Sequence, residues 1–138
     1  MKILYIEDYA ALAQVVCALL RGHGYEVEHH ALGKTGLERF RQDPQSWDAI
    51  IVDLELPDVS GQSLMPEIAA QRPALPIVVY SGLKGVEDRF ELYSMGASAL
   101  LSKPCGAQDL LDVLKGLTEP PQYPLNEFSL KDSKPLPK

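Results

Sequence analysis

The chain has 138 residues, close to the size of one domain, and it contains no run of about 18 apolar residues that could cross a membrane as a helix. Its 19 Asp and Glu residues outnumber its 13 Lys and Arg residues, which gives a formal net charge of −6 and argues against a surface that neutralises nucleic-acid phosphates or anionic membranes. The two cysteines, Cys17 and Cys105, are too few for a disulfide framework, so we expect reduced thiols in a cytoplasmic protein.

The first part of the chain alternates between short β-rich runs and longer helical patterns. Residues 2–6 are apolar and β-branched, which favours a strand. Residues 9–21 carry apolar side chains at helical spacing, and the glycines at 22 and 24 end this pattern. The same reasoning predicts a second strand over residues 25–30 and a second helix over residues 33–41.

The central and C-terminal parts continue this alternation. Residues 49–54 form a nearly continuous apolar run, interrupted by Asp53, which is typical of a strand buried on both faces of a parallel sheet. Ser60 is a candidate cap for a helix that extends to about residue 71. The remaining predicted elements are strands over residues 76–80 and 98–102 and helices over residues 87–95 and 107–117.

Five strands that alternate with five helices predict an α/β fold in residues 1–118, with a doubly wound parallel sheet flanked by helices. Residues 119–138 differ from the rest of the chain, because they hold five of its 11 prolines and three acids against three bases. We therefore predict a Pro-rich tail or linker there, extended and mobile.

Polar residues follow four of the five predicted strands: Glu7 and Asp8, Asp53, Ser81, and Lys103. Open α/β sheets bind ligands beyond the carboxyl ends of their strands, so these side chains are expected to meet. Clustered carboxylates suit Mg²⁺, while a lysine and a hydroxyl suit the oxygens of a phosphoryl group. Taken singly, each residue is more often a solvated loop residue or a helix cap. Their combination indicates phosphoryl chemistry on one aspartate.

The chain resembles the receiver domain of response regulators in two-component signalling. The matching segments are Glu7-Asp8, Asp53-Leu54-Glu55-Leu56-Pro57 with Gly61, Ser81-Gly82, and Lys103-Pro104. The resemblance covers residues 1–118 and implies a flavodoxin-like sheet with the strand order 2-1-3-4-5 found in a chemotaxis receiver.

The resemblance also implies roles for these residues. Asp53 would be the phosphoacceptor, and it would take a phosphoryl group from a phosphohistidine on a histidine kinase or a histidine phosphotransfer protein. The Mg²⁺ ion would be held by Glu7, Asp8, Asp53 and the backbone carbonyl of Glu55. Ser81 and Lys103 would contact the phosphoryl group, and the Lys103–Pro104 bond would be cis.

Such a protein regulates others and is not an enzyme beyond its own Asp phosphorylation and dephosphorylation. Phosphorylation would change the binding of a downstream output protein or domain through the fourth helix, fifth strand and fifth helix, without direct contact to nucleic acid or membrane.

Three positions depart from the family pattern. Leu100 stands where an aromatic residue usually turns inward on activation, and Cys105 stands where Phe often follows the Lys-Pro pair. Glu55, two residues after the acceptor, carries a carboxylate that we expect near the phosphoryl group, and it provides a hypothesis for how the lifetime of the phosphoryl-aspartate is set.

Two other functions fit parts of this pattern. A phosphatase on a related sheet also uses an Asp nucleophile, Mg²⁺ and Lys, although position 55 is Glu where those enzymes usually have Asp. A receiver-like binding module without phosphorylation is less consistent with the intact set of site residues. His29 and His30 are adjacent in a predicted strand, so they point to opposite faces and do not form a shared metal site. Trp47 is predicted to pack in the core, and a lowered pKa of Cys105 beside Lys103 is the less favoured interpretation of that thiol.

Overall fold

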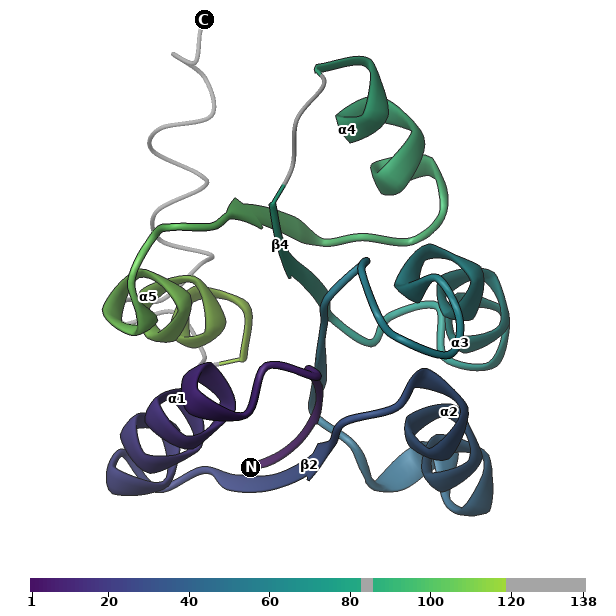
Figure 1. Ribbon diagram of the computed structural model, residues 1–138. Coiled ribbons are helices and arrows are strands. Elements are labelled where there is room, and N and C mark those ends of the chain that lie inside the picture. The colour runs from purple at the N-terminus through teal and green to yellow at the C-terminus, as the bar shows by residue number, and fades with distance from the viewer. Residues whose placement is uncertain (83–85, 119–138) are drawn as a thin grey trace, which may run out of the picture.

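The computed structural model describes residues 1–82 and 86–118, with the backbone alone for residues 86–88. Five parallel strands form one sheet in the order β2-β1-β3-β4-β5 (Figure 1). The sequence pattern predicted the parallel sheet, and the resemblance implied the strand order. The strands are β1 (Lys2–Ile6), β2 (Glu26–His30), β3 (Ala49–Val52), β4 (Ile77–Ser81) and β5 (Ala99–Ser102). The predicted tail over residues 119–138 lies outside the described residues.

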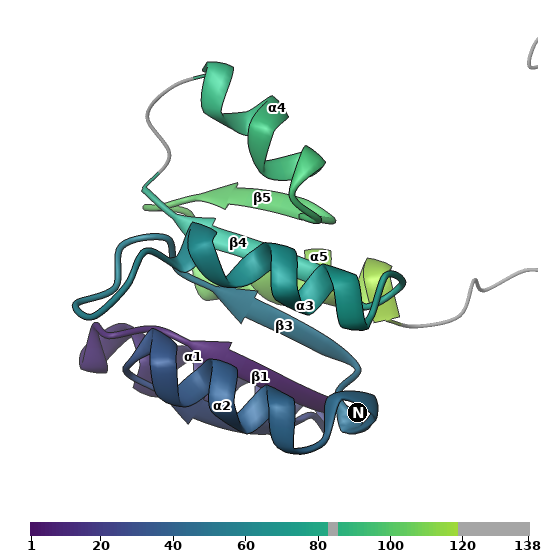
Figure 2. The ribbon, with the colours of Figure 1, turned by 90° about the vertical axis from the view of Figure 1, so that its right-hand side faces the viewer.

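Helices cover both faces of the sheet. The elements are α1 (Ala10–Gly22), α2 (Gly33–Gln42), α3 (Met65–Gln71), α4 (Val86–Ser94) and α5 (Ala107–Thr118), with short 3₁₀ helices η1 (Pro44–Ser46) and η2 (Gly61–Leu64). Helices α1 and α5 lie on one face, and α2, α3 and α4 lie on the other (Figures 1 and 2). Within the described residues, no helix is long and apolar enough to cross a membrane.

The parallel register brings the carboxyl ends of the strands to one edge of the sheet. Ile6, the last residue of β1, lies opposite His30 in β2 and Val52 in β3. Ser81 at the end of β4 lies opposite Ser102 at the end of β5. The residues that follow β1, β3 and β5 are therefore neighbours of Ser81 in space, although they are distant in the sequence.

Strand β3 is apolar on both faces because it lies between two hydrophobic cores. Ile51 packs in the core under α1 and α5, whereas Ile50 packs in the core under α2, α3 and α4. Both side chains are fully buried, and burial of each contributes roughly 1.5–3 kcal/mol relative to an exposed side chain. The nearly continuous apolar run is thus confirmed as a central strand.

Strand β3 ends at Val52, two residues before the predicted end. The chain turns away at Asp53, and the Gly61 N–H then donates a 2.8 Å hydrogen bond to the Leu54 carbonyl oxygen. A Cβ atom at Gly61 would collide with the Asp53 carbonyl oxygen, so only glycine allows the returning chain to come this close. This close approach stops β3 directly before Asp53.

The segment after Ser60 also differs from the prediction. The Ser60 hydroxyl caps it as expected and accepts a 3.1 Å hydrogen bond from the Gln62 N–H. However, residues Gly61–Leu64 form a 3₁₀ helix, and the α-helix begins only at Met65. Pro66 lies in the first turn of that helix, where its missing N–H is tolerated, and it cannot support an α-helix that starts further upstream.

Trp47 packs in the core as predicted, and its side chain is 1% exposed. The ammonium of Lys2 and the guanidinium of Arg39 lie over its ring at 4.7 Å and 5.1 Å from the centroid. Trp47 therefore joins the start of β1 to α2, away from the carboxyl edge of the sheet.

Candidate functional site

Three carboxylates converge at the carboxyl edge of the sheet. Glu7 and Asp8 directly follow β1, and Asp53 directly follows β3. Glu7 is 0% exposed and Asp53 is 5% exposed, whereas Asp8 faces solvent. One oxygen of each carboxylate lies within 4.8 Å of the other two. The structure thus brings together all three acids that the sequence placed at these strand ends.

Lys103 reaches this cluster from the end of β5. Its Nζ atom lies 2.9 Å from Glu7 Oε1 and 2.9 Å from Asp53 Oδ2. Its backbone N–H donates a 2.9 Å hydrogen bond to the Ser81 carbonyl oxygen, which continues the pairing of β4 with β5. The Lys103–Pro104 peptide bond is cis. The ammonium therefore joins two buried carboxylates from different strands.

Ser81 and two backbone groups complete the environment of Asp53. The Ser81 hydroxyl donates a 2.6 Å hydrogen bond to Asp53 Oδ1, and the Glu55 N–H donates to the same oxygen at 3.0 Å. The Ser81 hydroxyl in turn accepts a 3.3 Å hydrogen bond from the Leu54 N–H. Each carboxylate oxygen of Asp53 thus has its own partners, Oδ1 with Ser81 and Oδ2 with Lys103.

The pKa values of Asp53 and Glu7 are shifted in opposite directions. Burial alone would raise the pKa of Asp53, but hydrogen bonds from Ser81, Lys103 and the Glu55 N–H outweigh it and hold this pKa below its usual value. Burial raises the pKa of Glu7, and the charge of Asp53 adds to the effect despite the hydrogen bond from Lys103. Burial alone would lower the pKa of Lys103, but its bonds to Asp53 and Glu7 raise it. Asp53 is therefore a carboxylate at neutral pH.

The donor set suits a small divalent cation. Carboxylate oxygens are the ligands that Mg²⁺ prefers, and three of them lie together here. Three carboxylates and one ammonium leave a formal charge of −2 when all are ionised, which one divalent cation would balance. The fourth ligand expected for Mg²⁺ is the backbone carbonyl of Glu55. The N–H of this residue donates a hydrogen bond to Asp53, and the Glu55 side chain is exposed.

His29 adjoins the site through the backbone, a contact that sequence reasoning missed. Its Nε2–H donates a 2.6 Å hydrogen bond to the Glu7 carbonyl oxygen, and its ring centroid lies 5.5 Å from that of Tyr5. His30 has other partners: its Nε2 atom lies 2.9 Å from Glu28 Oε2 and its Nδ1 atom lies 3.3 Å from Thr35 Oγ1. The available signal was the position of His29 at the end of a strand that neighbours β1.

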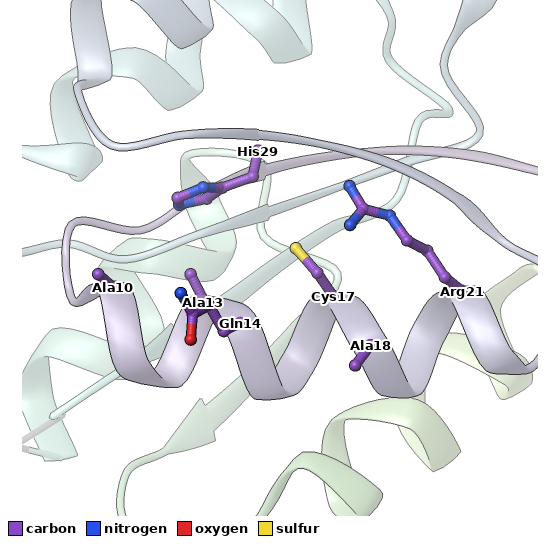
Figure 3. A pocket seen from close by; sticks show the side chains of 7 residues that line it. All are labelled: Ala10, Ala13, Gln14, Cys17, Ala18, Arg21 and His29. Atoms are coloured by element: carbon purple, nitrogen blue, oxygen red, sulfur yellow. The ribbon is translucent and has the colours of Figure 1, made fainter.

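His29 also lines a hollow between α1 and β2 with a volume of about 410 Å³ (Figure 3). The other residues that line this hollow are Ala10, Ala13, Gln14, Cys17, Ala18 and Arg21. The imidazole therefore lies between this hollow and the backbone of Glu7.

Asp58 fixes the loop that follows Asp53. Its two carboxylate oxygens accept hydrogen bonds from the Gly33 and Lys34 N–H groups, each at 2.9 Å. These groups form the start of α2, where Leu32 has no side chain that can cap the helix. The loop that carries Glu55 is thus tied to α2, and the missing local cap was the sequence signal for such a partner.

Leu100 and Cys105, the two residues near β5 that depart from the family pattern, have different surroundings. Leu100 is half-buried and packs in the core under α2, α3 and α4. Cys105 is half-buried on the opposite side of the sheet. Burial raises the pKa of the Cys105 thiol and the charge of Asp109 adds to this, so the interpretation of a lowered pKa is wrong.

The family model described as the response regulator receiver domain matches residues 3–115. The cell cycle response regulators CtrA of Brucella ovis and Brucella canis are each 31% identical to the chain over 111 residues, which cover 80% of the chain and 47% of each relative. The chain therefore spans about half the length of these curated relatives.

Solved structures give the same result. A CheY-like receiver domain protein from Methanospirillum hungatei is 28% identical with a TM-score of 0.76, and the match covers 83% of this chain and 90% of that one. The non-phosphorylated HemR receiver domain from Leptospira biflexa is 26% identical with a TM-score of 0.80, and the match covers 88% and 98%. The chain belongs to the family of response regulator receiver domains of two-component signalling.

Proposed function

We propose that Asp53 of this receiver domain is the phosphoacceptor, with Ser81 and Lys103 as the groups that contact the phosphoryl oxygens. The observation that carries this proposal is the division of partners on Asp53. One of its oxygens is bonded to the Ser81 hydroxyl at 2.6 Å and the other to the Lys103 ammonium at 2.9 Å. A neutral donor and a cation thus already surround the carboxylate on which negative charge would increase.

The reaction is transfer of a phosphoryl group from a phosphohistidine. A carboxylate oxygen of Asp53 forms a bond to phosphorus while the phosphorus–nitrogen bond of the donor breaks. The imidazole nitrogen leaves with the electron pair and takes up a proton. The lowered pKa of Asp53 supports this role, because the carboxylate and not the acid is the nucleophile.

Mg²⁺ is the proposed cofactor, held by Glu7, Asp8, Asp53 and the backbone carbonyl of Glu55. When bound, the cation neutralises negative charge that the phosphoryl oxygens gain during transfer. Glu7 also positions Lys103, since its Oε1 atom accepts the hydrogen bond that orients the Lys103 ammonium. Exposure of Asp8 supports direct access of a hydrated cation to this carboxylate.

The proposed partners follow from this chemistry. A histidine kinase or histidine phosphotransfer protein would supply the phosphoryl group in the cytoplasm, and a downstream output protein or domain would bind the face formed by α4, β5 and α5. Phe90 and Tyr93 on α4 are 81% and 50% exposed, which supports this face as a docking surface. We assign residues 1–118 to the receiver domain and residues 119–138 to a Pro-rich tail or linker.

Mass spectrometry of the intact chain tests the proposal. Incubation with Mg²⁺ and acetyl phosphate should add one phosphoryl group, and Asp53→Asn should abolish the addition. A chain that gains no mass in the presence of Mg²⁺ would contradict the proposal and favour a binding module without phosphorylation. Turnover of many phosphoesters without a lasting adduct would instead indicate a phosphatase.

A further inference from the structure

Tyr80 is a buried aromatic residue that lies beneath the turn carrying Lys103. It directly precedes Ser81 in β4, and its side chain packs in the core under α1 and α5 with 1% exposure. Its hydroxyl donates a 2.7 Å hydrogen bond to the Cys105 carbonyl oxygen. Since Cys105 is two residues after Lys103, this bond fixes the far end of the turn.

The other bonds that hold this turn come mainly from its own backbone and from β4. The Lys103 N–H donates to the Ser81 carbonyl oxygen at 2.9 Å, and the Cys105 N–H donates to the Ser102 carbonyl oxygen at 3.0 Å. A second side-chain bond, from the Ser102 hydroxyl to the Lys103 carbonyl oxygen, is 3.4 Å long and therefore weaker. Among the described contacts, the Tyr80 hydroxyl thus makes the shorter of the two side-chain hydrogen bonds that the carbonyl oxygens of Lys103 and Cys105 accept.

The ring of Tyr80 also contacts the Lys103 ammonium. Lys103 Nζ lies 5.5 Å from the ring centroid, inside the range of about 6 Å in which a cation is attracted to an aromatic face. The same nitrogen bonds Glu7 and Asp53. Leu100, where the family usually has its aromatic residue, packs against the opposite helical layer.

We propose that Tyr80 is a positioning residue for phosphoryl transfer, which holds the Lys103 ammonium against Asp53 through the Cys105 carbonyl and through its ring. The proposal rests on the proposed function, because Tyr80 acts on the phosphoryl group only by way of Lys103. Removal of the hydroxyl should therefore leave the fold intact and allow the ammonium to move away from Asp53.

Tyr80→Phe in the full chain is the direct test, with Tyr25→Phe as the matched control. Tyr25 is also buried, and its hydroxyl lies 3.2 Å from Thr118 Oγ1 at the other end of the sheet. We expect Tyr80→Phe to slow phosphorylation of Asp53 by acetyl phosphate about three- to tenfold, the range that corresponds to one hydrogen bond. Tyr25→Phe should keep the wild-type rate.

Nuclear magnetic resonance of the lysine ammonium groups gives a readout that does not depend on phosphorylation. Lys103→Met identifies the signal of Lys103, and this signal should shift and broaden in Tyr80→Phe while it stays unchanged in Tyr25→Phe. A purely structural contribution of Tyr80 would lower the free energy of unfolding without moving this signal. An unchanged Lys103 signal in Tyr80→Phe, or equal slowing of both tyrosine variants, would overturn the inference. A wild-type chain that takes no phosphoryl group would overturn the proposed function alone, because the ammonium signal still tests the position of Lys103.

Discussion

The Ser81 hydroxyl bonds Asp53 Oδ1 at 2.6 Å from the end of the neighbouring strand, and both side chains are buried. The same hydroxyl accepts a hydrogen bond from the Leu54 N–H, so it joins β4 to the loop that follows Asp53. One oxygen atom of Ser81 therefore contacts both the Asp53 carboxylate and the backbone of the loop that follows it.

Replacement of Ser81 by Ala should slow phosphorylation of Asp53 by about 10- to 150-fold, because a hydrogen bond to a charged group contributes about 1.5–3 kcal/mol when it is made in the transition state. Ser98→Ala is the control. Ser98 accepts a 3.1 Å hydrogen bond from the Ile77 N–H at the opposite end of β4, so its loss should lower stability and leave phosphorylation unchanged. Intact-mass time courses with acetyl phosphate measure both rates, and equal rates in Ser81→Ala and wild type would contradict this role.

Glu7→Gln should stabilise the chain at pH 7 in the absence of Mg²⁺. Burial raises the pKa of Glu7 above its unfolded value, so its charge opposes folding at pH above that raised value, and this penalty disappears as the pH falls through it. The difference in the free energy of unfolding between Glu7→Gln and wild type should therefore become smaller as the pH is lowered from 7 towards 4.

Urea unfolding at several pH values measures this difference in the free energy of unfolding. Added Mg²⁺ should then stabilise the wild type more than Glu7→Gln, because a cation that binds only the folded state stabilises it by an amount that grows with the logarithm of its affinity. A wild type that is more stable than Glu7→Gln at pH 7 without Mg²⁺ would show that the charge of Glu7 favours folding.

Asp58→Ala should lower the melting temperature and weaken Mg²⁺ binding together, because Asp58 holds the loop after Asp53 to the start of α2. The Lys34 N–H, with the Gly33 N–H and the local backbone, lowers the pKa of Asp58. The carboxylate of Asp58 therefore stabilises the folded chain above the usual Asp pKa of about 4, and this stabilisation is lost as the pH falls through the lowered pKa. Circular dichroism melting curves at pH 7 and pH 3 test whether the stabilisation by Asp58 decreases at low pH. Asp58→Asn, which keeps one oxygen acceptor, should show a smaller loss, and a pH-independent difference between Asp58→Ala and wild type would exclude the charge as its cause.

Glu55→Gln should lengthen the lifetime of the phosphoryl-aspartate severalfold. The Glu55 side chain is exposed and its backbone N–H bonds Asp53, so we expect its carboxylate to reach a water molecule that attacks the phosphoryl group and to accept a proton from it. The mass of the adduct is followed after removal of the phosphodonor. Glu26→Gln, an exposed position at the start of β2, should behave as wild type, and an unchanged lifetime in Glu55→Gln would reject the hypothesis.

The sequence predicted the sheet because the apolar periods of strands and helices differ clearly along the chain. It also predicted that Glu7, Asp8, Asp53, Ser81 and Lys103 share one edge, since parallel strands deliver their carboxyl ends to the same side. The end of β3 was misplaced because it depends on the approach of Gly61, which returns only after a loop. A steric contact between distant backbone segments leaves no periodic signal.

His29, Asp58 and Tyr80 were missed as neighbours of the site for a related reason. The atoms that they bind are backbone groups of Glu7, Gly33 and Cys105, and each lies more than twenty residues away in the sequence. A side chain that bonds a distant backbone group carries no local motif, because any residue type can supply its partner. Only the folded chain identifies these contacts.

Burial of the bridge between Lys103 and the carboxylates of Glu7 and Asp53 has a consequence for how the protein responds to ionic strength. Dissolved ions screen exposed charges strongly and buried pairs much less. The arrangement around Asp53 should therefore persist across the salt range of a living cell. Changes in salt concentration would then act on the encounter between this domain and its partners, and leave the contacts of Asp53 unchanged.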